Sequence, residues 1–546
     1  MTPKLLASGA TALALSFALV AQPSAAPATA AAGPAAPDAP AVGTAASNNA
    51  LPLGPSGLPE TRTARALQPG VTWTHIDRGS VDPAVRWVVE LSIPSTASSP
   101  DPDAPPRSVQ DRASADALVA SLAAHDVDAA AQPVTQSRAA DVAAGVIGYR
   151  VRLVTTFPSK AGADAELSRL RAMGFAGRSW YAGWDGGTAA GGHWSVNVLT
   201  IDPREFRGEI GGTYGPTIET RERTSWLAAY EKATAAINAG FFVFDPAAGA
   251  EGDPAGAGVY DGHLLSETVG RRPVLVLDPR GAHTAVTRPA WEGTVQLPTG
   301  RAALDGIDRV PGLIRNCGGQ GDTPTDQPLH DVTCTDSGEL VVFNREFGAH
   351  TPAGAGREAV LDSAGRVVRV EGVRGTVLRD GERSIQATGD RVAELDGIRV
   401  GSAVPLSLKL TSASGATLTR PGVSVLNGGP QLLQGGASHI TQAADGMVHP
   451  GNPSFQYGWA LQRNPRTFAG VDGSGRTVLV TVDGRQLGEM GLSVQEAADV
   501  AKSLGLVDAL NLDGGGSTAM VVGGALVSHP SDAAGERAVG DAIFVR

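Results

Sequence analysis

One run of residues combines a carboxylate, three glycines and two hydroxyls: Asp513-Gly514-Gly515-Gly516-Ser517-Thr518. Three successive glycines add nothing to a core and cost backbone entropy, so a chain keeps them where it turns sharply or lets a ligand approach its amides. Successive N–H groups in such a turn can form a concave anion-binding site. The run therefore predicts either a tight hairpin turn or an anion cradle, with Asp513 and the two hydroxyls at its rim.

Other chemical motifs are excluded by individual residues. No lysine follows the glycines, which excludes a phosphate-binding loop of the Walker type. The segment Gly515–Ala519 lacks the last glycine of a nucleophile elbow, and a strand-like segment follows it where that motif needs a helix. A serine hydrolase acting through Ser517 stays open as an alternative. No zinc-binding spacing occurs, so we expect no required cofactor, although the acidic rim leaves room for a divalent cation.

Five further segments place polar residues beside glycine, proline or strand-like residues. They are Ile237–Phe242, Leu426–Leu432, Asn464–Asp472, Val482–Arg485 and Gly535–Val539. Together with Asn511–Ser517, this set in this order resembles the phosphodiester glycosidase family, over about residues 69–76 and 193–546. Ala239 and Asn464 depart from the family's usual glycine and frequent histidine. Neither change removes a candidate catalytic group.

The resemblance implies an enzyme that cleaves the bond between a sugar's anomeric carbon and a phosphodiester oxygen. The leaving phosphate is already acidic, so it needs positive potential and N–H donors more than protonation. Arg466 and Arg485 are candidates for bidentate phosphate contacts, although Arg466 could instead cap a helix or bind a loop carbonyl. The amides of Gly514, Gly515 and Gly516, with the hydroxyls of Ser517 and Thr518, would complete the cradle.

A sugar with oxocarbenium character also needs a carboxylate as nucleophile, base or electrostatic partner. Asp513 and Asp483 are the first candidates for this catalytic role, and Glu536 is the third. Asp483 could instead belong to a simple hairpin turn, and Glu536 could pair with Arg485 at the surface. Asn238 and Asn427 are candidate binding residues, although asparagines beside glycines often fix turns instead. We assign no role to the histidines, which are His330, His439, His449 and His529 among the loop residues.

The elements around these motifs predict an α+β fold with a large mixed β-sheet. Trp194–Ile201 alternates strictly, which predicts a half-buried strand. Ser493 with Glu496 forms a capping box at the start of a helix reaching Leu504. By the family resemblance, residues 67–80 hold the first strand of the catalytic domain, which continues over residues 193–546, and Val71–Ile76 and Trp194–Ile201 are its first two strands.

Residues 85–190 would then be inserted between those strands as two small α/β repeat modules. Each module has a strand, a helix and a second strand, with helices over about 115–124 and 161–173. The modules resemble SPOR-type repeats, which implies binding to the glycan strands of peptidoglycan. A purely structural pair of modules remains the alternative.

The chain's N-terminus predicts export. Lys4, the apolar run Leu5–Val20 and small residues up to Ala26 form a signal peptide over residues 1–26. An Ala/Pro-rich disordered linker follows over residues 27–66. In an oxidising compartment, Cys317 and Cys334 should form a local disulfide, although a metal-binding or catalytic thiol is the alternative. We therefore expect a secreted or wall-associated protein without a membrane span after cleavage.

Composition limits the partners. The net charge is -11 and no basic run is present, which argues against nucleic acid. The expected partner is a glycoconjugate that contains a phosphosugar. A non-enzymatic alternative is a wall protein whose modules grip peptidoglycan while the C-terminal domain only recognises phosphosugars.

Overall fold

The computed structural model describes residues 50–94, 107–187, 191–317, 322–325 and 327–546. The predicted signal peptide and the linker up to residue 49 lie outside the described residues. For the rest of the predicted linker, residues 50–66, the prediction of disorder is wrong, because Leu51 and Leu53 are fully buried and strand β1 (Glu60–Gln68) begins inside it. The pairing of β1 with β2 (Val71–Gly79) supplies the backbone partners that a linker would lack.

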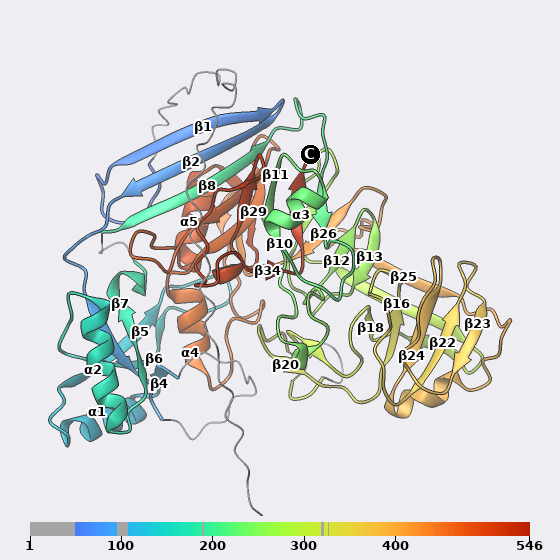
Figure 1. Ribbon diagram of the computed structural model, residues 1–546, viewed down its shortest axis with the longest axis horizontal. Coiled ribbons are helices and arrows are strands. Elements are labelled where there is room, and N and C mark those ends of the chain that lie inside the picture. Colours follow the sequence, from blue (N-terminus) through green and yellow to red (C-terminus); the bar gives the residue numbers. More distant parts are fainter. Residues whose placement is uncertain (1–49, 95–106, 188–190, 318–321, 326) are drawn as a thin grey trace, which may run out of the picture. The chain divides into compact units, whose positions relative to one another are not determined.

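The main sheet has eight strands in the order β1-β2-β8-β30-β29-β31-β27-β28, and Figure 1 shows β1, β2 and β8 as long neighbouring arrows. The further strands are β8 (His193–Ile201), β30 (Thr477–Val482), β29 (Arg466–Asp472), β31 (Leu506–Asn511), β27 (Gln431–Gln434) and β28 (Ala437–Ser438). Every pair in this sheet is antiparallel, so the expectation of a mixed sheet is wrong. The predicted strands before and after the insertion both form, and the structure adds that they pair with each other, since Val71 lies opposite Ile201.

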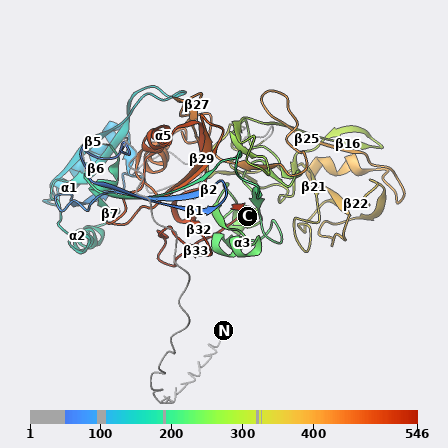
Figure 2. The ribbon, with the colours of Figure 1, turned by 90° about the horizontal axis from the view of Figure 1, so that it is seen from above.

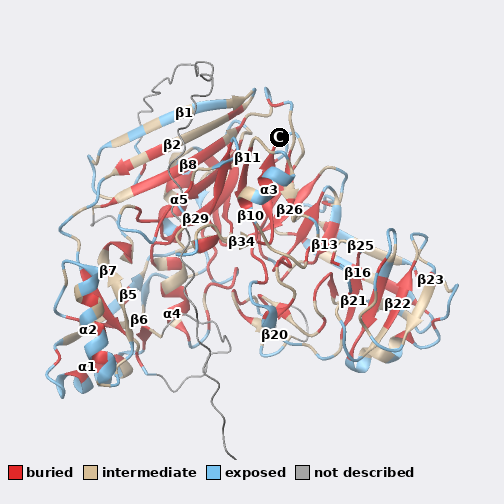
Figure 3. Cartoon of the chain, viewed as in Figure 1, coloured by how far each residue is buried: buried red, intermediate tan, exposed pale blue. Residues whose placement is uncertain are grey.

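Both faces of this sheet are covered, which makes the central strands red in Figure 3. On one face, Val196 and Val198 pack into a core shared with helix α5 (Val494–Ser503). On the other face, Leu199 and Ile201 join a second core. The prediction that residues 194–201 form a half-buried strand is therefore wrong: the alternation separates two cores and not a core from solvent. The capping box that starts α5 is confirmed.

The second core is shared with two smaller sheets. One has the order β33-β32-β11-β35-β9 and the other β13-β12-β26-β14-β15. Their strands are β33 (Ala525–Leu526), β32 (Met520–Val522), β11 (Ala235–Asn238), β35 (Ala542–Val545), β9 (Ile210–Thr213), β13 (His263–Ser266), β12 (Gly258–Tyr260), β26 (Ser424–Asn427), β14 (Val274–Leu277) and β15 (Ala285–Thr287). Helix α3 (Thr224–Tyr230) contacts β11.

Further β structure lies between residues 290 and 411 around a third core. A three-stranded sheet holds β17 (Gly300–Ala303), β16 (Ala290–Leu297) and β25 (Leu406–Thr411), and a five-stranded sheet holds β18 (Gly306–Ile307), β21 (Leu340–Phe343), β24 (Arg383–Ala387), β22 (Arg357–Leu361) and β23 (Val367–Glu371). The short pairs are β19 (Ile314–Arg315) with β20 (Thr333–Cys334) and β10 (Glu222–Arg223) with β34 (Ala538–Val539). Within the described ranges, no helix combines the length and apolarity needed to cross a membrane.

The inserted segment forms one unit and not two modules in tandem. Its elements are β3 (Trp87–Leu91), β4 (Val109–Gln110), α1 (Arg112–Ala123), β5 (Ala129–Gln136), β6 (Gly145–Leu153), α2 (Lys160–Ala172) and β7 (Gly177–Tyr181). Strand β3 of the first half pairs with both β6 and β7 of the second half, which gives the split β-α-β-β-α-β arrangement. Helices α1 and α2 contact these strands, as Figure 2 shows. The two halves interleave because neither buries its apolar strand alone.

Candidate active site

Three of the sequence motifs meet because β29 begins where its neighbours β30 and β31 end, at one end of the strands of the main sheet. Strand β29 runs antiparallel to both of its neighbours, so its first residue, Arg466, lies opposite Val482 at the end of β30. Phe468 lies opposite Asn511 at the end of β31. The segments that follow β30 and β31 therefore emerge beside Arg466, with Arg485 on one and Asp513 on the other.

A cavity of about 730 Å³ opens at this edge. Its ionisable lining residues come from segments that are far apart in the sequence: Arg178, Asp245, Arg315, His330, Asp331, Arg466, Arg485, Asp513 and Arg537. Aromatic side chains and the whole run Gly514–Ser517 complete the wall. The cavity thus unites the predicted glycine run with two predicted arginines and with several residues that sequence reasoning did not select.

Asp513 is held in place by the end of β11. The side-chain amide of Asn238 donates to the main-chain oxygen of Asp513 at 2.7 Å, and the Asp513 N–H donates to the Ala239 oxygen at 2.9 Å. Asn238 is fully buried, and its own side-chain oxygen accepts from Thr467 Oγ1 and from the Ala519 N–H. Asn238 is therefore a positioning residue for Asp513 and not a sugar contact as predicted.

The amides of Gly514 and Gly515 are not free to form the predicted anion cradle. The Gly514 N–H donates to the Asp513 carboxylate and the Gly515 N–H donates to the Pro465 oxygen, both at 2.9 Å. Two of the three predicted donors are thus already engaged. The glycines instead allow close approach: a β-carbon on Gly516 would overlap the Arg537 guanidinium, and Gly515 has a positive φ of 60°.

Burial makes the Asp513 side chain an unusually weak acid. It raises the pKa of this carboxyl to about 7, although the Ser517 hydroxyl and the Arg537 guanidinium act in the opposite direction. A carboxyl that titrates near neutrality inside a cavity is suited to general acid–base or nucleophilic work. The Ser517 and Thr518 hydroxyls are buried without a hydrogen-bond partner among the described residues. Ser517 lines the cavity, whereas Thr518 does not.

Five arginines of the described residues line the cavity, and three of them, Arg466, Arg485 and Arg537, lie beside the glycine run. Arg466 is buried and donates only to main-chain oxygens, those of Leu492 and Trp459, so no carboxylate neutralises it among the described residues. Burial and the neighbouring Arg485 lower the pKa of Arg466 to about 9. Arg485 donates to the Asn464 side chain and adopts a left-handed φ of 60°, a strained conformation for a residue with a side chain.

Arg537 is the third of these arginines, and the sequence analysis missed it although it follows Glu536 directly. Its guanidinium pairs with Asp532 through two hydrogen bonds of 2.8 and 3.1 Å and lies 5.3 Å from the Phe244 ring centre. Nothing in the sequence shows that Arg537 lies at the cavity. This follows from the position of β34, which begins at the next residue, relative to the glycine run. Phosphate oxygens are the ligands that such convergent guanidinium groups recognise.

The disulfide loop supplies a second carboxylate that the sequence analysis also missed. Cys317 and Cys334 are bonded, as predicted, between β19 and β20. The loop they close places His330 and Asp331 against the cavity. Asp331 pairs with Arg315 at 3.1 Å, and this guanidinium helps to lower the pKa of the carboxyl although burial acts to raise it. Asp513 and Asp331 thus have pKa values pushed apart, a common arrangement of acid–base pairs.

Burial lowers the pKa of His330 to about 3, so this imidazole is neutral at physiological pH. Its ring packs against Phe241 and Trp459. The inserted unit adds Trp180 and Trp184 to the same cavity, together with Arg178, whose guanidinium lies 4.0 Å from the Trp180 ring centre. A wall of this kind, apolar rings with a few polar groups, suits the faces of a sugar ring.

The structure does not support two predicted catalytic carboxylates. Glu536 accepts from the Ser225 N–H at 2.8 Å and from its hydroxyl at 2.5 Å, so it holds the first turn of α3. Asp483 is fully buried, accepts from the Ser195 hydroxyl and does not line the cavity. Asn427 is also structural, because it bonds both main-chain groups of Phe241. It fixes a turn instead of reaching a ligand.

Comparison with known proteins points to one family. A family model described as phosphodiester glycosidase matches residues 355–546. The bovine protein named N-acetylglucosamine-1-phosphodiester alpha-N-acetylglucosaminidase is 33% identical over 160 residues. That match covers 29% of this chain and 30% of the bovine protein, so the chain spans under a third of the length of this curated relative.

Two crystal structures resemble the whole fold. A candidate exported protein of Burkholderia pseudomallei is 31% identical, with a TM-score of 0.80, and the match covers 92% of this chain and 100% of that chain. The part of this chain left uncovered is shorter than the inserted unit, so that structure includes much of the insertion. A hypothetical protein of Synechocystis is 16% identical, with a TM-score of 0.50 over 89% of this chain and 76% of that chain, which shows a similar fold only.

Proposed function

Because the chain belongs to the phosphodiester glycosidase family, we propose that it hydrolyses the bond between a sugar's anomeric carbon and a phosphodiester. The observation that carries this proposal is the cavity itself. It combines one carboxyl with a pKa of about 7, Asp513, with the guanidinium groups of Arg466, Arg485 and Arg537. The bovine relative's name makes an N-acetylglucosamine-1-phosphodiester the first substrate to test.

In the proposed mechanism, the three arginines bind the phosphodiester and stabilise the phosphate that leaves. The leaving group has a low pKa, so the reaction needs positive potential there and no strong acid. The aromatic wall formed by Trp459, Trp180 and Phe241 holds the sugar ring. Asp513, in its ionised form, acts on the anomeric carbon as nucleophile or on a water molecule as base. Asp331 stays ionised and stabilises positive charge on the sugar.

The serine hydrolase alternative lacks support from the geometry. A nucleophilic serine needs a base that accepts its proton. Ser517 Oγ makes no direct hydrogen bond to a base among the described residues, although it is near enough to Asp513 to lower the pKa of that carboxyl. Its hydroxyl is better suited to bind a phosphate oxygen. Labelling by a fluorophosphonate probe that is lost in Ser517→Ala protein would reverse this choice.

The test of the proposed function is direct. Purified protein is incubated with an N-acetylglucosamine-1-phosphodiester, and release of the free sugar is followed by NMR, which also records the anomer formed first. We expect release by the wild type and at least about 100-fold slower release by Asp513→Asn protein. Tight binding of the substrate without any released sugar would favour the non-catalytic alternative.

We also propose that the protein acts outside the cytoplasm on extracellular or envelope glycoconjugates. The Cys317–Cys334 disulfide supports this location, because disulfides form and persist in oxidising compartments. Fractionation of producing cells tests the proposal, which predicts the protein in the medium or on the cell wall. Recovery with the cytoplasmic fraction would contradict it.

A further inference from the structure

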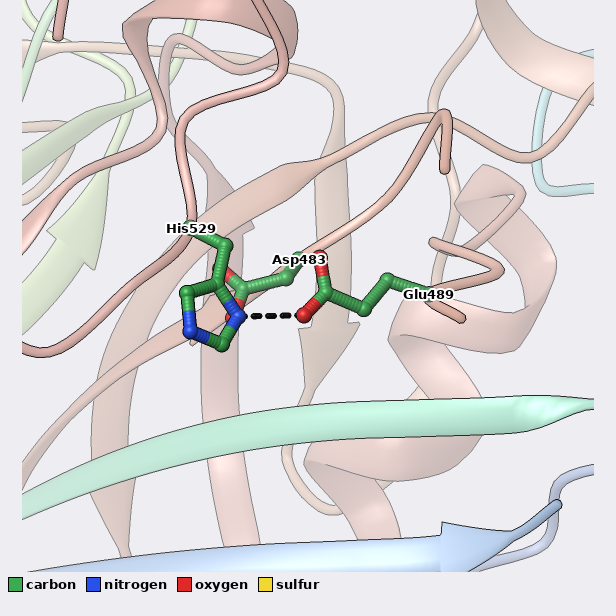
Figure 4. A group of neighbouring side chains, drawn as sticks. All are labelled: Asp483, Glu489 and His529. Carbon is green, nitrogen blue, oxygen red and sulfur yellow. Dashed lines mark hydrogen bonds and ion pairs between the residues drawn. The ribbon is translucent and has the colours of Figure 1, made fainter. Parts of the chain in front are cut away.

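Three side chains that the proposed hydrolysis does not use converge at the end of β30. They are Asp483, Glu489 and His529, and Figure 4 shows them directed toward one another. One ligand atom from each lies within 4.8 Å of the other two. His529 Nδ1 contacts Glu489 Oε1 and lies 3.6 Å from Asp483 Oδ2.

Each carboxylate of this cluster has one oxygen to which the described residues make no direct hydrogen bond of regular geometry. Asp483 Oδ1 and Glu489 Oε2 are buried without a partner among the described residues. Asp483 is 0% exposed and Glu489 is 8% exposed. A buried carboxylate oxygen without a donor is costly, and a bound ion is one of the arrangements that satisfy it.

The charges of the cluster point to a cation. Two buried carboxylates face a single imidazole, so acidic ligands outnumber basic ones in this group. Asp77 lies close enough to act on His529 as a further negative charge. Ser195 donates to Asp483 Oδ2 at 2.9 Å and so orients this carboxylate from outside the cluster, as the outer partners of metal ligands do.

We propose that Asp483, Glu489 and His529 bind a divalent transition-metal ion, Zn²⁺ or Mn²⁺. One imidazole with two carboxylates suits these ions better than Ca²⁺ or Mg²⁺, which prefer oxygen ligands alone. Three protein ligands leave a position for water. The His529 side chain is 65% exposed, so the ion can exchange with solvent from that side.

The ion joins two segments that carry cavity arginines. Arg485 follows Asp483 by two residues, and Gln486 Nε2 already donates to the Pro530 oxygen at 3.1 Å across the two segments. Asp532, which pairs with Arg537, follows His529 by three residues. The ion therefore has a structural role: it links the two segments and keeps the guanidinium groups of Arg485 and Arg537 in position relative to Asp513.

The test measures metal binding directly. The full chain, without an affinity tag, is stripped with EDTA and titrated with Zn²⁺ and with Mn²⁺ by calorimetry, and Co²⁺ is added separately to record an absorption spectrum of the coordinated ion. We expect one saturable site. The variants His529→Gln and Glu489→Gln should weaken binding at least about tenfold, whereas His263→Gln, at an exposed histidine of β13, should not change it.

A second measurement does not depend on catalysis. The metal should raise the melting temperature of the wild type and of His263→Gln protein, and should leave that of His529→Gln protein unchanged. Absence of saturable binding by the wild type, or unchanged affinity in both cluster variants, overturns the proposal. Failure of the proposed hydrolysis with every substrate would leave these binding results standing, so the two failures are distinguishable.

Discussion

The side-chain amide nitrogen of Asn238 lies 2.7 Å from the main-chain oxygen of Asp513, and this contact joins the end of β11 to the centre of the candidate active site. Both partners belong to segments that the sequence places 275 residues apart. The same side chain bonds Thr467 at the start of β29. One buried amide thus fixes three strand ends around the cavity.

The variant Asn238→Ala should therefore lower kcat more than it changes KM. It removes the donor to Asp513 and leaves the Thr467 hydroxyl and the Ala519 N–H without their acceptor, at a cost on the order of 3 kcal/mol. Asn427→Ala is the matched control, because it breaks similar buried bonds but at Phe241, so KM should rise instead. Steady-state kinetics and urea unfolding measure both effects. Equal kinetic changes in the two variants would contradict a positioning role for Asn238.

Replacement of Asp513 by asparagine should abolish turnover without destabilising the fold. Above pH 7 Asp513 is ionised, and burial makes this charged form unfavourable. A neutral asparagine avoids that cost and keeps an acceptor for the Gly514 N–H. We expect a loss of at least about 100-fold in kcat together with an unchanged or higher melting temperature at pH 8. Asp245→Asn is the control, since it removes a charge from the same cavity while asparagine still caps the following turn. Wild-type turnover by the Asp513 variant would remove Asp513 from the mechanism.

The pH dependence of kcat/KM should report the Asp513 carboxyl. Its pKa is raised to about 7, so it is protonated below that pH and the active ionised form appears as the pH rises. We expect kcat/KM to rise about tenfold per pH unit below 7 and to level off above it. His330→Gln should keep the midpoint, because that imidazole titrates near 3. If the midpoint near pH 7 disappeared in the His330 variant, the titrating group would be His330 and not Asp513.

The raised pKa of Asp513 also makes the stability of the fold depend on pH, and stability falls as the pH rises whereas kcat/KM increases. The folded pKa of Asp513 lies above the ordinary value of 3.8, so the folded state binds the proton more tightly than the unfolded state. The stabilisation is complete below pH 4 and is lost as the pH rises through 7. Urea unfolding between pH 4 and 8 should show the wild type losing stability relative to Asp513→Asn protein. A constant difference across this range would show that the carboxyl is not shifted.

Loss of the Arg485 guanidinium should weaken binding of the phosphodiester. Among the described residues, the Arg485 guanidinium donates hydrogen bonds to the Asn464 side chain alone, so Arg485→Gln should leave the fold intact. Loss of one charge-assisted contact predicts a rise in KM of about tenfold or more. Arg301→Gln, at an exposed ion pair with Glu292, is the control and should not change KM. The wild-type KM should also increase with ionic strength, and a KM that ignores both changes would exclude Arg485 from the phosphate site.

Reduction of the Cys317–Cys334 disulfide should lower activity through the loop that it closes. The bond spans 17 residues of sequence, and its loss should cost about 3 kcal/mol. Because this loop carries His330 and Asp331, kcat should fall under conditions in which most of the protein stays folded. Activity and circular dichroism are followed together in dithiothreitol, with the double variant Cys317→Ser/Cys334→Ser as the reagent-free comparison. Full activity in that variant would show that the loop does not need the bond.

Features that depend on neighbours in the chain were predicted correctly. The capping box at Ser493 and Glu496, the disulfide and the strands on both sides of the insertion are examples. Predictions that depended on burial failed, because alternation along residues 194–201 cannot tell a solvent face from a second core. The tandem modules failed for a similar reason: each half looks complete in sequence, and only the pairing of β3 with β6 and β7 shows one interleaved sheet.

The sequence by itself determined the chemistry that the chain could offer: residue types and spacing single out the glycine run with Asp513, and the family resemblance adds Arg466 and Arg485. Only the tertiary structure decided which of these groups share a cavity. It added Arg537 and Asp331, and it moved Glu536 to the start of α3 and Asp483 into a separate cluster. The physical reason is distance along the chain. Strand pairing and core packing bring together groups hundreds of residues apart, and neither leaves a local pattern that spacing can reveal.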